Sequence, residues 1–124
     1  LIIDRGGTYT VSNNIAGTGG LTNAGAGTVT LTGSNTLSGP TRVSGGTLVL
    51  SNTSGGQAAG GTSSIQVDSG ATLALGADNQ IGNSTSLILN GGTFRVGTDT
   101  AGYSDTLGTL TLNANSTIDL GSFT

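Results

Sequence analysis

The stretch that decides the fold is GPTRVSGGTLVLSN, residues 39–52. In it, two glycines precede a short run in which Leu48 and Leu50 lie two residues apart, and the run ends at Ser51 and Asn52. An alternation of period two is typical of a β-strand with one buried face. The glycines provide a corner where the chain changes direction. The stretch therefore predicts a corner followed by one short strand.

The same pattern recurs along the whole chain. Its variants are GGTYTVSN (6–13), AGTVTLTG (26–33), SGATLALG (69–76), GGTFRVGT (91–98) and ANSTIDLG (114–121). The second apolar residue of each run lies 19 to 25 residues after that of the previous run, a spacing found in solenoid coils. A second set of short apolar positions precedes these runs with the same period. Two sets with one period predict a repeating coil with at least two strands.

The links between these strands exclude two common arrangements. DSG (68–70) and NGG (90–92) are too short for the helical crossover of a conventional parallel pair. They also mostly lack the two-residue hairpin pattern. A third, weaker strand is expected at 13–17, 35–39 and 79–83, where an aliphatic residue lies beside asparagines. The sequence predicts an all-β fold, a parallel β-helix (β-solenoid) of about five to six coils with three short strands per coil.

Stacked coils place equivalent residues in rows along the axis. One predicted interior row contains Tyr9, Val29, Leu48, Leu73, Phe94 and Ile118. Its neighbour contains Val11, Leu31, Leu50, Leu75, Val96 and Leu120. The outward file between the two rows contains Thr10, Thr30, Val49, Ala74, Arg95 and Asp119. A single coil buries too little to offset its ordering entropy, so we expect stability to be a sum over neighbouring coils.

Composition limits the chemistry. The 124 residues include 24 glycines but no cysteine or histidine, and the net charge is −3. Three separated arginines offer no basic surface, so we expect no nucleic-acid partner. No stretch approaches the ~18 apolar residues of a membrane span, so we expect no direct membrane insertion. Because His, Cys, Lys and Glu are all missing as bases or nucleophiles, we expect no enzyme, no catalytic residue, no metal site and no cofactor.

Two segments depart from the period. Residues 52–64 contain about four extra residues and predict a loop at a corner. Residues 97–108 bring together Asp99, Tyr103 and Asp105, which are the candidate ligand-binding residues. Three roles stay open for this cluster: catalysis, a calcium or carbohydrate contact, or a solvated loop. On the outward file, we expect Arg95 and Asp119 of neighbouring coils to form a surface ion pair.

Residues 17–52 carry GTGGLTNAGAGTVTLTGSNTLSGPTRVSGGTLVLSN, which closely resembles the passenger-associated transport repeat of autotransporters. The matching positions are Gly19, Leu21, Gly25, Gly27, Thr28, Leu31, Gly33, Asn35, Thr36, Gly39, Thr41, Val43, Gly46, Thr47 and Leu48. Leu37 stands where tyrosine is common, and Pro40 and Arg42 replace small residues. The resemblance implies that the β-helix is right-handed.

The resemblance also implies a function. Residues 1–124 would be a single β-helical segment of a longer passenger, exported across a Gram-negative outer membrane through the C-terminal barrel of the same precursor. We expect a structural and export segment at the cell surface, a rigid stalk whose sequential folding assists translocation. The first alternative is an adhesin or self-associating filament segment, which binds a host-surface or glycan ligand or pairs through its ends. The second alternative is a polysaccharide-acting β-helix.

Overall fold

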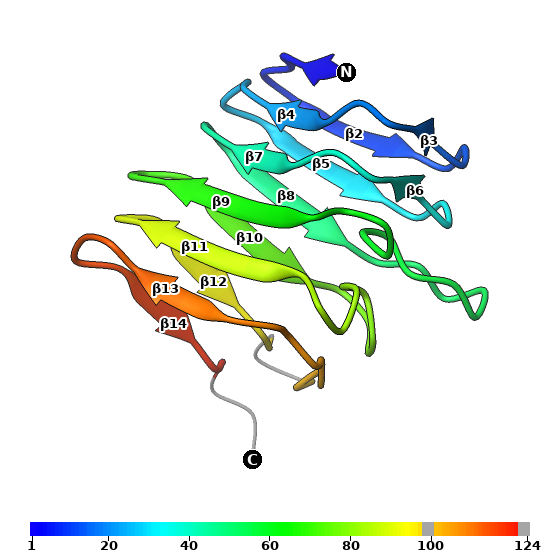
Figure 1. Cartoon of the computed structure of the whole chain (residues 1–124). Helices are drawn as coiled ribbons and strands as arrows, with labels where there is room; N and C mark the ends of the chain where they lie inside the picture. The colour runs from blue at the N-terminus through cyan, green and yellow to red at the C-terminus, as the bar shows by residue number, and fades with distance from the viewer. Residues whose placement is uncertain (98–100, 122–124) are drawn as a thin grey trace.

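The computed structural model describes residues 1–97 and 101–121. Within these ranges the regular elements are all strands, which wind through two long parallel sheets, here called sheet A and sheet B (Figure 1). Sheet A has the order β1 (Ile2–Ile3), β4 (Leu21–Asn23), β7 (Thr41–Val43), β9 (Ser64–Asp68), β11 (Ser86–Asn90) and β13 (Leu110–Leu112). Sheet B contains β2 (Thr8–Val11), β5 (Thr28–Leu31), β8 (Thr47–Leu50), β10 (Thr72–Leu75), β12 (Thr93–Arg95) and β14 (Thr117–Asp119).

Each strand pairs in parallel with the equivalent strand one coil away, so six coils begin at β1, β4, β7, β9, β11 and β13 in turn. The predicted right-handed parallel β-helix is confirmed, with about five complete turns. The chain passes from one sheet to the other at glycine-containing corners and returns along the third side of the coil.

Among residues 1–97 and 101–121, the third side is regular only at the start of the solenoid. There β3 (Ala16–Gly17) pairs with β6 (Thr36–Leu37), as the pattern predicts. At 79–83 the expected strand is reduced to one bridge between Ala59 and Ile81. The coil length changes at the same place, because Leu21 pairs with Thr41, 20 residues on, whereas Thr41 pairs with Ile65, 24 residues on. The extra residues lie in the predicted corner loop at 52–64, where the structure has no long strand.

The register of sheet B confirms that the predicted rows stack, and it confirms the burial of their central members. The predicted burial is wrong at the ends: Tyr9, Ile118 and Leu120 are 43%, 44% and 62% exposed, because the first and last described coils are covered on one side only. Leu48 aligns with Val29 on one side and with Leu73 on the other, and all three are at most 1% exposed. The row continues to Phe94, which is also buried. Each buried leucine contributes about 1.5–3 kcal/mol, and it does so only when the neighbouring coils are in place. The core is therefore a thin aliphatic column between the sheets.

Close stacking of the corners depends on glycine. Gly46 has a φ of +56°, in the left-handed region that residues with a Cβ rarely adopt. A Cβ on Gly46 would also meet the carbonyl oxygen of Gly27 in the preceding coil. The neighbouring N–H of Thr47 donates to that same carbonyl at 3.0 Å. The corner can therefore approach its neighbour closely enough to bond it only when glycine occupies position 46.

Candidate functional site

The predicted cluster at 97–108 is partly described. Asp99 lies outside the described residues. Tyr103 is half-buried against the core, and its backbone N–H donates to the carbonyl of Val96 at 2.9 Å. Asp105 is half-buried and directs its carboxylate at the backbone of the preceding coil. The structure thus gives Tyr103 and Asp105 structural contacts, and a ligand role for the cluster stays a prediction.

Asp105 caps a corner of the fourth coil. Its Oδ2 accepts the N–H of Gln80 at 2.6 Å and the N–H of Ile81 at 3.0 Å, while Oδ1 accepts the N–H of Thr106 at 2.9 Å. In return, Oδ1 of Asp78 accepts the N–H of Ser104 at 2.7 Å. Burial raises the pKa of Asp105 above its ordinary value and outweighs the opposing effect of the N–H donors. These two carboxylates join the fourth and fifth coils in both directions.

The arginines also have partners on the surface. Nε of Arg95 lies 2.9 Å from Oδ2 of Asp119, which confirms the expected ion pair. Arg42 makes a second pair with Asp68 at 2.7 Å. Burial raises the pKa of Asp68, but hydrogen bonds from Gln66 and Arg42 outweigh it, so the pKa lies below its ordinary value. The pairing of Arg42 was missed because its partner lies two positions beyond the directly paired residue.

Arg5 and Asp119 complete the surface electrostatics. The guanidinium of Arg5 lies 4.9 Å from the ring centroid of Tyr9. The N–H of Gly121 and the guanidinium of Arg95 lower the pKa of Asp119.

In the part of the chain that the structure describes, no three acidic, histidine or cysteine side chains are placed to hold a metal ion. The described residues also contain no helix long and apolar enough to cross a bilayer.

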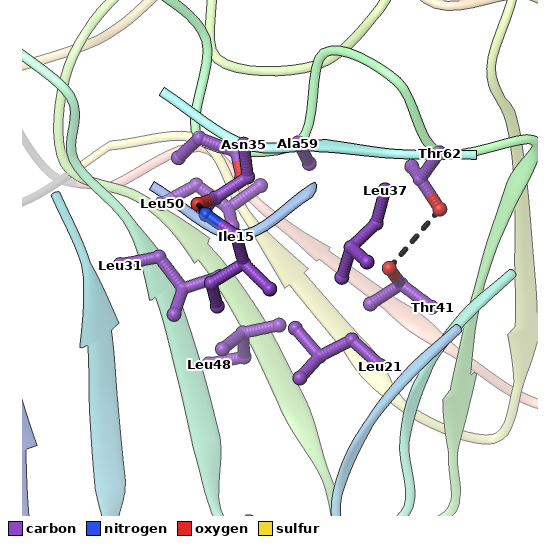
Figure 2. Close-up of a pocket in the computed structure, with 11 residues that line it drawn as sticks. Ile15, Leu21, Leu31, Asn35, Leu37, Thr41, Leu48, Leu50, Ala59 and Thr62 are labelled. Atoms are coloured by element: carbon purple, nitrogen blue, oxygen red, sulfur yellow. Dashed lines mark hydrogen bonds between the residues drawn. The ribbon is translucent and has the colours of Figure 1, made fainter. Parts of the chain in front are cut away.

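An internal cavity of about 10 Å³ lies between the third side and the sheets. Figure 2 shows Leu31, Leu48 and Leu50 around it, with the hydroxyls of Thr41 and Thr62 facing each other at 3.0 Å. A cavity of this size holds at most about one water molecule. It belongs to the core and offers no room for an organic ligand.

A larger open groove of about 550 Å³ lies on the outside of the corner loop. Its lining includes the side chains of Ser34, Thr36, Gln57, Asn79 and Asn83, together with glycines of the 55–61 segment. We call it the amide-lined groove. The loop was predicted from the coil length, but the groove was not, because it needs side chains from three coils. Asparagines beside the corners were the one signal that pointed to it.

Comparison with protein families gives one match. The model of the passenger-associated-transport-repeat covers residues 21–50, inside the stretch at 17–52 that carries the resemblance. Residues 21–50 run from the start of β4 to the end of β8. Neither the curated proteins nor the solved structures gave a match to this chain. The chain therefore carries a passenger-associated transport repeat within a parallel β-solenoid, and both features fit a segment of a secreted autotransporter passenger.

Proposed function

We propose that this segment is a rigid spacer of an autotransporter passenger at the cell surface and that its coil-by-coil folding assists export through the C-terminal barrel of its precursor. The observation that carries the proposal is the uninterrupted parallel order of sheet A, from β1 to β13, in a chain that contains the transport repeat. Among the described strands of the two long sheets, each pairs with the equivalent strand of an adjacent coil. Folding can therefore proceed along the axis while part of the chain is still inside the barrel.

The edge of a finished coil acts as a template for the next one. When β10 joins β8, residues 72–75 align with residues 47–50, and Leu73 packs onto Leu48. The partners are about 25 residues apart in sequence, so each step closes only a short loop. Each added coil lowers the free energy of the emerged chain and opposes its return into the barrel.

Side chains that cross between coils support the spacer role. Asn35 accepts the N–H of Ile15 from the first coil at 2.8 Å and donates to the carbonyl of Ala58 in the third coil at 2.8 Å. Asp78 and Asp105 make the same kind of link further along. These bonds resist the sliding and bending of one coil over another. The result is a stiff column that can hold a distal region away from the cell.

The export role is tested in the precursor that carries this segment. Leu48→Asp and Leu73→Asp together place carboxylates in the interior row, where no partner exists, and should prevent coil stacking. The control is Thr30→Asp, which adds a carboxylate to the outward file of the same sheet. We expect the passenger with the interior changes to reach the surface more slowly than wild type and the control to keep the wild-type rate. Equal rates for all three chains would show that coil folding does not assist export.

A further inference from the structure

The amide-lined groove brings together polar side chains from three coils, and neither the spacer role nor the export role requires them. Ser34 and Thr36 come from the second coil, Gln57 from the corner loop of the third, and Asn79 and Asn83 from the fourth. Because neighbouring strands are ~4.8 Å apart, these coils span about 10 Å along the axis. The groove lies where the coil lengthens from 20 to 24 residues, so the inserted loop forms one wall.

Two amides of the groove hold each other in place. Nε2 of Gln57 donates to Oδ1 of Asn79 at 3.0 Å and to the carbonyl of Ile81 at 2.7 Å. Both protons of the Gln57 amide are used, and its Oε1 has no donor within the described residues. Asn79 has a φ of +53°, and its Nδ2 has no acceptor in the described part of the chain. The pair therefore presents one fixed acceptor and one fixed donor.

The other polar groups of the groove are also available. The side-chain amide of Asn83 and the hydroxyls of Ser34 and Thr36 have no hydrogen-bond partner among residues 1–97 and 101–121. No ionisable side chain lines the groove. Arg42 and Arg95 are paired with aspartates on the two sheets. The groove is thus a row of neutral donors and acceptors.

We propose that the amide-lined groove binds a neutral saccharide chain. A sugar hydroxyl donates one hydrogen bond and accepts others, as do the amides and hydroxyls of the groove. A carboxylate or phosphate would find no cation here, and an apolar ligand would leave the amides desolvated and unpaired. At Gly55, where a Cβ would have no heavy atom within 4 Å, the missing side chain lets a ligand approach the backbone closely. No aromatic ring lines the groove, so we expect a dissociation constant on the order of 1 mM.

The test is a titration of the full 124-residue chain, followed by the NMR shifts of its backbone amides. The probes are cellotetraose, maltotetraose and mannotetraose, with trigalacturonate as the anionic counterpart. We expect at least one neutral tetrasaccharide to shift the amides of Gly55, Gly56, Gly60 and Gly61 with saturation. Absence of such shifts at tens of millimolar, shifts confined to the sheet faces, or equal binding of trigalacturonate would each overturn the proposal.

Two matched variants complete the test. Asn83→Ala removes an exposed amide from the groove and should weaken binding about 3- to 10-fold. Asn115→Ala removes an exposed amide from the turn before β14, outside the groove, and should leave binding unchanged. Unaltered affinity in Asn83→Ala would contradict the proposal. The rate at which the passenger reaches the surface distinguishes a failure of this inference from a failure of the spacer and export proposal. We expect neither variant to change that rate, whatever its effect on saccharide binding.

Discussion

Asn52 and Gln80 are joined by two hydrogen bonds between the third and fourth coils. The backbone N–H of Asn52 donates to Oε1 of Gln80 at 2.5 Å, and Nε2 of Gln80 donates to the carbonyl of Asn52 at 2.9 Å. Asn52 in turn donates through Nδ2 to the carbonyl of Thr32 in the second coil at 2.8 Å. Gln80 is fully buried, so these bonds have no competition from water. The side-chain amide of Gln80 thus satisfies the backbone N–H and carbonyl of Asn52, which lies at a corner and has no strand partner for them.

Gln80→Leu should destabilise the solenoid. Leucine has a similar volume, but it leaves the N–H and the carbonyl of Asn52 buried without a partner, at a cost of about 2–4 kcal/mol in the free energy of unfolding. Urea denaturation followed by circular dichroism measures the change. The matched control is Gln66→Leu, since Gln66 is half-exposed and its side-chain amide donates to the carboxylate of Asp68 at 2.8 Å. If Gln66→Leu lost as much free energy of unfolding as Gln80→Leu, the two hydrogen bonds between Gln80 and Asn52 would not be the cause of the loss.

Leu73→Ala should cost about 2–5 kcal/mol of unfolding free energy, because it opens a cavity between two neighbouring coils. Leu73 is 0% exposed and lies between Leu48 and Phe94 in the register of sheet B. Leu112→Ala in β13 is the comparison, since Leu112 is 57% exposed, and we expect it to cost less than about 1 kcal/mol. Equal losses would mean that the interior row does not carry the stability of the stack. Thermal and urea denaturation of both variants give the answer.

The stacking of the interior rows could be predicted residue by residue, but the exposure of their end members Tyr9, Ile118 and Leu120 could not. Leu48 and Leu50 lie two positions apart after a glycine corner, and so do Leu73 and Leu75. Because a strand alternates its faces and a parallel coil repeats its register, these two facts fix which residues stack. The ion pair between Arg95 and Asp119 followed from the same register. Regular apolar spacing therefore determines most of the fold.

The corner chemistry could not be predicted in the same way. Whether Gln80 is buried depends on which backbone groups a corner leaves unpaired, and hydrophobic periodicity carries no information on that. Asp105 was singled out as a candidate ligand residue, yet its carboxylate is turned toward the N–H groups of Gln80 and Ile81. The amide-lined groove likewise depends on how an inserted loop lies against two other coils. These features need three-dimensional placement of residues that are about 20 to 25 positions apart.

Gly46→Ala should destabilise the solenoid by more than about 1 kcal/mol. The new Cβ would occupy a left-handed conformation and would meet the backbone carbonyl of Gly27, which cannot move without breaking its bond to the N–H of Thr47. Gly19→Ala is the control, because a Cβ at position 19 would have no heavy atom within 4 Å. We expect that variant to be neutral or slightly stabilising in thermal denaturation. A neutral result for Gly46→Ala would show that the corner relaxes away from its neighbour.

Asp105 and Asp68 should give opposite pH dependences. Burial raises the pKa of Asp105 above its ordinary value of 3.8, so between these two pKa values the folded chain binds more protons than the unfolded chain. The contribution of Asp105 to stability therefore falls as the pH rises through that window, and the stability of wild type relative to Asp105→Asn should increase on acidification from about pH 7 to pH 4.

Burial also raises the pKa of Asp68, but hydrogen bonds from Gln66 and Arg42 lower it overall. Its contribution is present above 3.8 and is lost as the pH falls through the lowered value, so wild type should lose its advantage over Asp68→Asn below about pH 4. Urea midpoints of wild type, Asp105→Asn and Asp68→Asn from about pH 3 to pH 7 test both signs. If the difference in midpoint between wild type and variant changed with pH in the same direction for both variants, the opposite pKa shifts of Asp105 and Asp68 would be contradicted.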